Sequence, residues 1–262
     1  MARYTFTGLN KRSTPNTQAG LTTKFGSVIL DDIAGVTTLN VSGRGLIENE
    51  FTLEQKAGAS GAWAYDDDRV PSREIEVEIQ ILSNDIRVVY NKLNSALHRG
   101  LQQLSFSDDV GKHYEAKYSH MSMPKEDSNN AIVTLFFVAP QPFRYGAWKT
   151  LQPGATLSTQ GTAQAEIRRI TIDVSASGSG AFRVTNNGTS RKITVNKLAV
   201  PSDKFIISYV ANQPILRVNG QPAPQMLVLT SEYEEMQYMS NGDRFTTSQA
   251  ASVRVEYRDR WF

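Results

Sequence analysis

The sequence has 262 residues, of which 40% are hydrophobic and 21% are charged, so it has the composition of a soluble globular protein and is long enough for two domains. Its 28 lysine and arginine residues nearly balance its 26 aspartate and glutamate residues, and a net charge of +2 gives the chain as a whole no electrostatic preference for nucleic acid or an anionic membrane. Cysteine is absent, which excludes disulfide bonds, cysteine-based zinc sites and thiol catalysis.

The N-terminal residues 1–12 do not contain the continuous apolar stretch of a signal peptide. The longest strongly apolar run, residues 132–139, is far shorter than the roughly 20 residues that cross a bilayer. We therefore expect a protein that is made and folded in the cytoplasm and has no membrane anchor.

Alternation with a period of two residues, or short apolar runs, dominates both halves of the chain and is typical of strands with one buried face. The clearest case is residues 73–82, in which aliphatic residues alternate with Glu74, Glu76, Glu78 and a glutamine. A loop that is predicted to be mobile precedes this strand at residues 56–68.

One amphipathic helix is predicted at residues 83–99, where the apolar residues follow a spacing of three and four. Ser83 or Asn84 is expected to cap its N-terminus, and Asp85 suits the positive end of the helix dipole. Gly100 directly follows the helix, as is typical of a helix C-terminus. We expect the apolar stripe to pack on the sheet that contains the alternating strand.

The second half is predicted to be entirely β. Asn-Gly pairs at 187–188 and 219–220 supply the positive φ angles that tight hairpin turns require, and a third pair, at 241–242, is predicted to precede the last strand. A stretch rich in glycine, threonine, glutamine and alanine precedes this half and predicts a linker at 147–165. The predicted fold is therefore mainly β, with an α+β domain at 1–146 that has one helix and an all-β domain at 147–262.

No group of residues has the spacing of an active site. His98 suits the last turn of the helix, and His113 and His120 would face opposite sides of one strand, so a shared metal is not expected. Asp66, Asp67 and Asp68 lack the alternating carboxylates and the terminal glutamate of a calcium-binding loop. The basic pairs 168–169 and 191–192 are typical of solvated or interfacial positions. We expect no enzyme activity, no metal and no cofactor.

The three glutamates of the alternating strand allow two interpretations. Residues two apart on a strand lie about 7 Å from each other, a separation that inverting glycosidases use for their carboxylates. Any solvated strand face has the same spacing, however, and three equivalent positions do not provide an acid and a base with different pKa values. The pattern at Glu74, Glu76 and Glu78 therefore favours a solvated or interfacial face over catalysis.

The order of several weak motifs is more specific than any of them alone, because it extends over some 200 residues. In this order the chain resembles the distal tail proteins of long-tailed, non-contractile phages that infect Gram-positive bacteria. The motifs are residues 51–57, RVPSREIEV at 69–77, HRG at 98–100, LSF at 104–106, HYEA at 113–116, the apolar run 132–139, PQPFRYG at 140–146, GTAQAE at 161–166 and residues 182–198.

The resemblance implies an N-terminal α+β split-barrel domain related to tail-tube proteins, followed by a galectin-like β-sandwich. It also implies a homo-hexameric ring, single or stacked, at the distal end of the tail tube, with a channel through which DNA passes without specific binding. The implied partners are the tail tube protein, the tail-associated hub protein and, at the sandwich, a receptor-binding protein. The expected location is the tip of the phage tail in the virion.

Two departures from the family pattern are visible in the sequence. Gln141 stands where the family often has aspartate, and residues 231–239 are polar and aromatic where a hydrophobic strand is more usual. An alternative function is a carbohydrate-binding adhesion module that recognises host glycans through the second domain. Such a module needs exposed aromatic rings, for which Tyr233, Tyr238 and Trp261 are candidates. A third class, a cell-wall hydrolase, needs an acid–base pair that the sequence does not offer.

The ring gives the glutamate row a function. Like charges on one strand face repel one another by a few tenths of a kcal/mol per pair. A channel wall would tolerate this cost, since acidic side chains on the wall keep passing DNA from adhering to it. We therefore hypothesise that Glu74, Glu76 and Glu78 line the channel. Pairing of these side chains with arginines of a neighbouring subunit is the alternative.

Overall fold

The computed structural model describes residues 20–47, 50, 53–55, 58, 60–64, 70–123, 130–210 and 213–262. The chain divides into two compact units, Met1–Arg144 with Phe262, and Tyr145–Trp261. Most of the predicted loop at 56–68, including Asp66–Asp68, lies outside the described residues. Within the described residues, no helix is long and apolar enough to cross a membrane.

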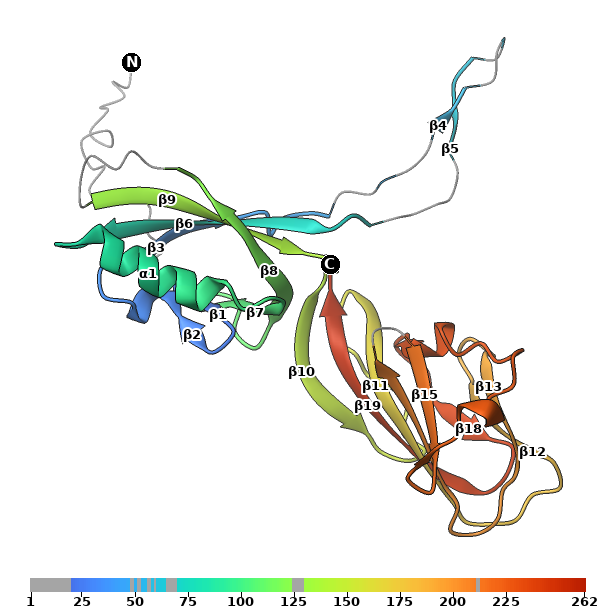
Figure 1. Ribbon diagram of the computed structural model, residues 1–262. Helices are drawn as coiled ribbons and strands as arrows, with labels where there is room; N and C mark the ends of the chain where they lie inside the picture. Colours follow the sequence, from blue (N-terminus) through green and yellow to red (C-terminus); the bar gives the residue numbers. More distant parts are fainter. Residues whose placement is uncertain are drawn as a thin grey trace, which may run out of the picture. The chain divides into compact units, whose positions relative to one another are not determined.

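The first unit is an open, bent sheet with one α-helix on its inner face (Figure 1). The strands β3, β6, β9 and β8 pair in that order, and β8 then pairs with β7, which pairs with β1 and through it with β2. Residues 117–121 of β8 pair with β9, whereas residues 114–116 pair with β7. The elements are β1 (Thr23–Phe25), β2 (Val28–Ile29), η2 (Leu30–Asp32), β3 (Val36–Ser42), β6 (Arg73–Leu82), α1 (Ile86–Leu97), β7 (Gln102–Phe106), β8 (His113–Met121) and β9 (Asn130–Ala139); β4 (Leu53–Glu54) and β5 (Trp63–Ala64) form a separate hairpin.

Strand β6 follows the alternation that its sequence predicts. Ile75, Val77, Ile79 and Ile81 are fully buried, while Glu74 and Glu76 are exposed and Glu78 is half-buried. The stripe of α1, with Val89, Leu93 and Leu97, packs into the same core as these aliphatic side chains, as expected. Burial of each such side chain stabilises the unit by about 1.5–3 kcal/mol.

The helix is shorter at its N-terminus than the sequence predicts, because Asp85 rather than Ser83 or Asn84 is the capping residue. The carboxylate of Asp85 accepts a hydrogen bond of 3.0 Å from the backbone N–H of Arg87. Ser83 instead accepts from the backbone N–H of Asp85 at 3.1 Å, which holds the capping residue in its extended conformation. Gly100 follows the helix with a φ of +74°.

We expect the Asp85→Ala variant to lose about 1 kcal/mol of unfolding free energy, because it leaves an N-terminal backbone N–H of α1 without its acceptor. Chemical denaturation measures this loss. The Arg87→Ala variant changes an exposed side chain on the same turn and keeps the cap, so it serves as the control. Equal midpoints for the Asp85→Ala variant and the unmodified protein would show that the cap contributes nothing.

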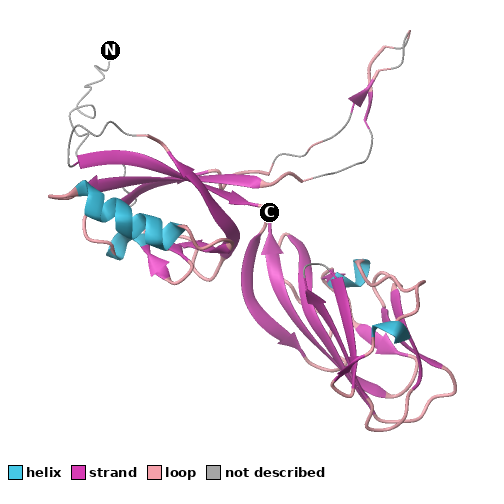
Figure 2. Ribbon diagram, in the orientation of Figure 1, coloured by secondary structure: helices cyan, strands magenta, loops and turns pink. Residues whose placement is uncertain are grey.

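The second unit is a β-sandwich (Figure 2). Its larger sheet has the order β16-β15-β14-β11-β19-β10, with β17 also paired to β11, and its smaller sheet has the order β13-β12-β18. The elements are β10 (Arg144–Leu151), β11 (Ala163–Val174), β12 (Ala181–Asn186), β13 (Lys192–Leu198), β14 (Lys204–Val210), β15 (Gln213–Val218), β16 (Gln221–Pro222), η3 (Pro224–Met226), η4 (Glu235–Gln237), β17 (Tyr238–Met239), β18 (Phe245–Thr247) and β19 (Ala251–Trp261).

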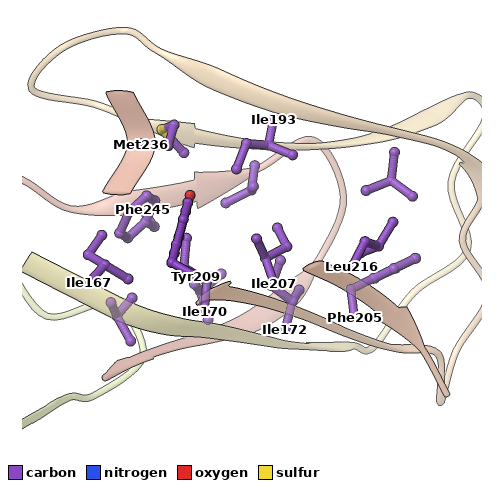
Figure 3. Packing of buried hydrophobic residues seen from close by; sticks show 14 of the residues in the cluster. Ile167, Ile170, Ile172, Ile193, Phe205, Ile207, Tyr209, Leu216, Met236 and Phe245 are labelled. Atoms are coloured by element: carbon purple, nitrogen blue, oxygen red, sulfur yellow. The ribbon is translucent and has the colours of Figure 1, made fainter. Parts of the chain in front are cut away.

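The core of the second unit lies between its two sheets. Figure 3 shows Ile170, Ile172 and Ile207 of the larger sheet on one side and Ile193 of the smaller sheet on the other. The fully buried rings of Phe182 and Phe205 stack across the core with centroids 4.8 Å apart. The predicted architecture, mainly β with one α-helix in the first part and a sandwich in the second, is confirmed.

Strands occupy both ends of the predicted linker at 147–165, and residues 152–162 between them form a connection without a strand. Strand β10 continues to Leu151 and pairs with β19, and β11 already begins at Ala163. Leu157, in the connection between them, is buried in the sandwich core. The small and polar residues of this stretch did not indicate these strand ends, because the backbone pairing of a strand does not require apolar side chains.

The Asn-Gly pairs do not all act as predicted. Asn219 and Gly220 both have positive φ, 51° and 83°, and join β15 to β16 in a tight turn. At 187–188 the turn joins β12 to β13 as expected, but Ser190 is the residue with positive φ, at 61°. The pair at 241–242 precedes the short strand β18 instead of the last strand.

Candidate interaction surfaces

The outer face of β6 carries a row of three carboxylates. Glu74, Glu76 and Glu78 lie opposite Val138, Phe136 and Thr134 of β9, none of which is basic. On the other side, Ser42 of β3 donates a hydrogen bond of 3.1 Å to Glu76. None of the three glutamates forms an ion pair with any residue that the structure describes. The structure therefore places the three predicted site residues on one face, where none of them has an ion-pair partner among the described residues.

The neighbouring strand β9 adds an apolar row to this outer face. Ile132 is 57% exposed, and Phe136 is half-buried beneath the ring of His120, which stacks on it with centroids 4.3 Å apart. We define the acidic face by the glutamate row of β6 together with Ile132 and Phe136.

A charged cluster fixes one end of the first unit. Arg44, which follows β3, forms a two-pronged ion pair with Asp108 in the turn between β7 and β8, with both N–O distances 2.7 Å. Asp109 accepts from Lys112 at 2.8 Å and from Arg144 at 3.1 Å. The cluster therefore joins three separate parts of the chain.

The cluster shifts the pKa values of both aspartates below their ordinary value. The hydrogen bond from Arg44 is the main cause at Asp108 and outweighs the opposing effect of burial on its pKa. At Asp109, burial raises the pKa, but the hydrogen bonds from Lys112 and Arg144 together lower it by more than burial raises it. Groups with lowered pKa values in the folded state stabilise it above their ordinary pKa, and this stabilisation is lost as the pH falls through the folded-state pKa.

In the Arg44→Met variant we expect the pKa of Asp108, measured by NMR titration, to rise toward its ordinary value near 3.8, because its main hydrogen-bond donor is gone. At neutral pH the variant should be less stable by about 0.2–1 kcal/mol, as is usual for a partly exposed ion pair. Unfolding curves of variant and unmodified protein should converge in acid, where the pair is lost in both. A difference in stability that persists unchanged in acid would assign the effect to packing.

The histidines, for which no shared metal is expected, include two that lie against aromatic rings of the first unit. His98 contacts the edge of Tyr118, with centroids 5.4 Å apart, and His120 stacks on Phe136. Among the described residues no group of three or more His, Asp or Glu side chains could hold a metal ion. Tyr233 packs against the sandwich core and is half-buried, so it is not an exposed sugar-binding ring.

Tyr238 and Trp261 are also engaged within the second unit. The guanidinium of Arg260 lies 4.5 Å from the ring centroid of Tyr238, and the indole N–H of Trp261 donates to the carbonyl of Gln160 at 3.1 Å. Both rings are half-buried. The aromatic platform that the carbohydrate-binding alternative requires is therefore not formed by the three predicted side chains.

Sequence reasoning missed an arginine–aromatic cluster on the outer side of the larger sheet. The guanidinium of Arg258 lies between two rings, 3.7 Å from the centroid of Tyr145 and 4.7 Å from that of Trp148. Its Nε donates to Glu166 at 2.8 Å. Strand β19 carries arginine at alternating positions, a signal that predicts a charged outer face but does not predict which rings lie beside it.

Residues 160–261 match the family model described as siphovirus-type tail component, C-terminal domain. The sequence matches no curated protein. Among solved structures, the Dit protein of phage SPP1, described as a paradigm of the hub adsorption apparatus in phages that infect Gram-positive bacteria, has the same fold: the TM-score is 0.75 at 18% identity, over 92% of this chain and 99% of that one.

Two structures of the phage P2 baseplate in its activated conformation, one with calcium and one with strontium, also match. Each has a TM-score of 0.46 and 8% identity, over 90% of this chain and 97% of the other. The family match and the SPP1 fold confirm the resemblance that the order of motifs indicated.

Proposed function

We propose, from the premise that this chain is a siphovirus-type tail component, that it forms a hexameric ring at the distal end of the tail tube and acts there as a non-enzymatic structural protein. The ring joins the tube to the host-recognition apparatus at the tail tip and leaves a channel for DNA. Its partners are the tail tube protein on one side and the tail-associated hub protein on the other. A receptor-binding protein docks on the second unit.

The observation that carries this proposal is the one-sided burial of the sheet β3-β6-β9-β8. One face of this sheet holds the core of the first unit, and the other presents the acidic face. If each of six copies contributes this sheet to the inner wall, the wall has about 24 strands, more than the 16–18 strands of porins that already leave an aqueous channel. Such a wall encloses a wide bore and turns the three glutamates of each copy inward.

An acidic bore suits the passage of DNA. The duplex carries one negative charge per roughly 1.7 Å of its axis, and proteins bind it without sequence preference mainly through lysine and arginine contacts to phosphate. Carboxylates on the wall repel these phosphates and prevent adhesion. In the described part of the chain Glu74, Glu76 and Glu78 form no ion pair and face no cation on β9, which supports this function.

Light scattering coupled to size-exclusion chromatography tests the ring. We expect a particle of six times the 29.1 kDa chain mass, or twice that for two stacked rings. Negative-stain micrographs should show a central hole. A purified protein with the mass of a single chain at micromolar concentration, and without holes in micrographs, would contradict the proposal.

A further inference from the structure

The outer face of the larger sheet of the second unit carries more cations than anions. Alternation along β11, β14, β15 and β19 turns one set of side chains into the sandwich core and the other set outward. The outward set contains the anions Glu166, Asp173 and Glu256. It contains the cations Arg168, Arg169, Lys204, Arg217, Arg254 and Arg258.

Three ion pairs account for all three anions. Arg258 pairs with Glu166 at 2.8 Å, Arg169 with Glu256 at 3.3 Å, and Lys204 with Asp173 at 3.5 Å. The other three cations of this face are exposed and form no ion pair with any residue in the described part of the chain. They are Arg168, Arg217 and Arg254. The face therefore carries three exposed arginines that have no ion-pair partner among the described residues.

The unpaired arginines occupy defined positions on a rigid support. Arg217 of β15 lies opposite Ile206 of β14, Ile206 opposite Thr171 of β11, and Thr171 opposite Arg254 of β19. Three strand spacings thus separate Arg217 from Arg254, or about 14 Å. Arg168 is held at the β10 side of the sheet, where its guanidinium lies 5.6 Å from the ring centroid of Trp148.

Apolar side chains lie among these cations. Trp148 is 41% exposed, and Ile215, which neighbours the Arg217 row, is 40% exposed. The ring of Trp148 also lies 4.7 Å from the guanidinium of Arg258, measured to its centroid. Tryptophan and arginine are enriched among the residues that dominate protein–protein binding, whereas a polyanion alone would gain nothing from exposed isoleucine.

We propose that this surface, the arginine face (Trp148, Arg168, Arg217 and Arg254, with Ile206 and Ile215), docks an acidic surface of a protein partner. Three carboxylates of the partner pair with the three unpaired arginines, and apolar groups of the partner cover Trp148 and the two isoleucines. The partner that docks on the second unit would therefore have an acidic surface with apolar groups. Only the location of this partner in the phage tail rests on the proposed function.

The test uses the full chain and a fluorescein-labelled peptide of six Glu-Leu repeats as the probe. We expect R168E/R217E/R254E to weaken binding, measured by fluorescence anisotropy, about tenfold or more, because three charge pairs become repulsive. The matched control R183E/R191E/R244E makes the same change of charge at the smaller sheet and its turns, and should change binding less than twofold. The milder R168Q/R217Q/R254Q should lie between them and guards against misfolding of the first variant.

Three results would overturn the proposal. Equal loss of binding in the control would show that net charge alone attracts the probe. Tighter binding of polygalacturonate at matched carboxylate content would assign the face to a polysaccharide, and tighter binding of a duplex DNA of matched charge would assign it to nucleic acid. The ring is judged separately by light scattering on the same samples, because a single-chain mass in all variants would contradict the ring and leave the binding comparison intact.

Discussion

Replacement of the glutamate row by lysine should reduce delivery of the phage genome on the order of a hundredfold while the protein still folds and assembles. In E74K/E76K/E78K each copy replaces three acidic side chains by basic ones, so a ring of six would present 18 lysines to the DNA, three for each copy. Each lysine that reaches a phosphate releases counterions, and as few as six to ten such contacts change DNA affinity by several powers of ten over an ordinary range of salt. DNA should therefore adhere to the wall instead of passing it.

The measurement is plaque formation by phage that carry the variant, together with the amount of DNA left in adsorbed particles. A fair control reverses charges away from the acidic face. Glu234 and Glu235 are both exposed on the second unit, as Glu74 and Glu76 are on the first, so E234K/E235K can be compared directly with E74K/E76K. If both double variants infect equally well, the glutamates face solvent and not a channel.

The same variants separate the channel from the other interpretation of the row. If the carboxylates pair with arginines of a neighbouring subunit, even E74Q/E76Q/E78Q should lose those pairs and shift the light-scattering mass toward the single chain. If they line a bore, the glutamine variant should keep the mass of the ring and deliver DNA almost normally, because it attracts no phosphate. Mass and infectivity therefore change together in one case and independently in the other.

The sequence predicts those parts of the fold that depend only on which neighbouring side chains are buried and which are exposed. The alternation of residues 73–82 is confirmed because each side chain of β6 obeys the same choice between core and surface. The helix is predicted for the same reason, since its stripe has only one sheet to cover. Its cap was misplaced by one or two positions because Ser83, Asn84 and Asp85 all favour that role, and only the structure shows which carboxylate or hydroxyl reaches Arg87.

The parts that were missed depend on residues distant in the sequence. Strand β10 has no alternation of its own and exists because β19, more than 100 residues later, supplies its partner. The stacking of Arg258 on Tyr145 and Trp148 has the same origin. The unpaired arginines could not be identified in advance either, since a strand's alternation gives the charge of a face but not which charges on adjacent strands meet.

The largest loss of stability in the second unit is expected from Phe205→Ala, at about 3–5 kcal/mol. Phe205 is fully buried, and its ring stacks on Phe182 of the smaller sheet, so truncation removes apolar contact from both sheets and opens a cavity between them. Chemical denaturation followed by tryptophan fluorescence measures the loss, because Trp148 and Trp261 both belong to this unit. The surrounding side chains include Ile207 and Leu216, which are fixed by strand pairing and can fill the cavity only in part.

Ile215→Ala is the control, since Ile215 lies on the adjacent strand, is 40% exposed and points away from the core. It should cost less than about 1 kcal/mol, because much of its surface is already in water. The helix of the first unit has its own core, so hydrogen exchange of α1 should be unchanged in Phe205→Ala if the two units unfold separately. Loss of protection in α1 at the same denaturant concentration would show instead that the two cores form one cooperative unit, and the stability of the ring wall would then depend on the packing of the sandwich.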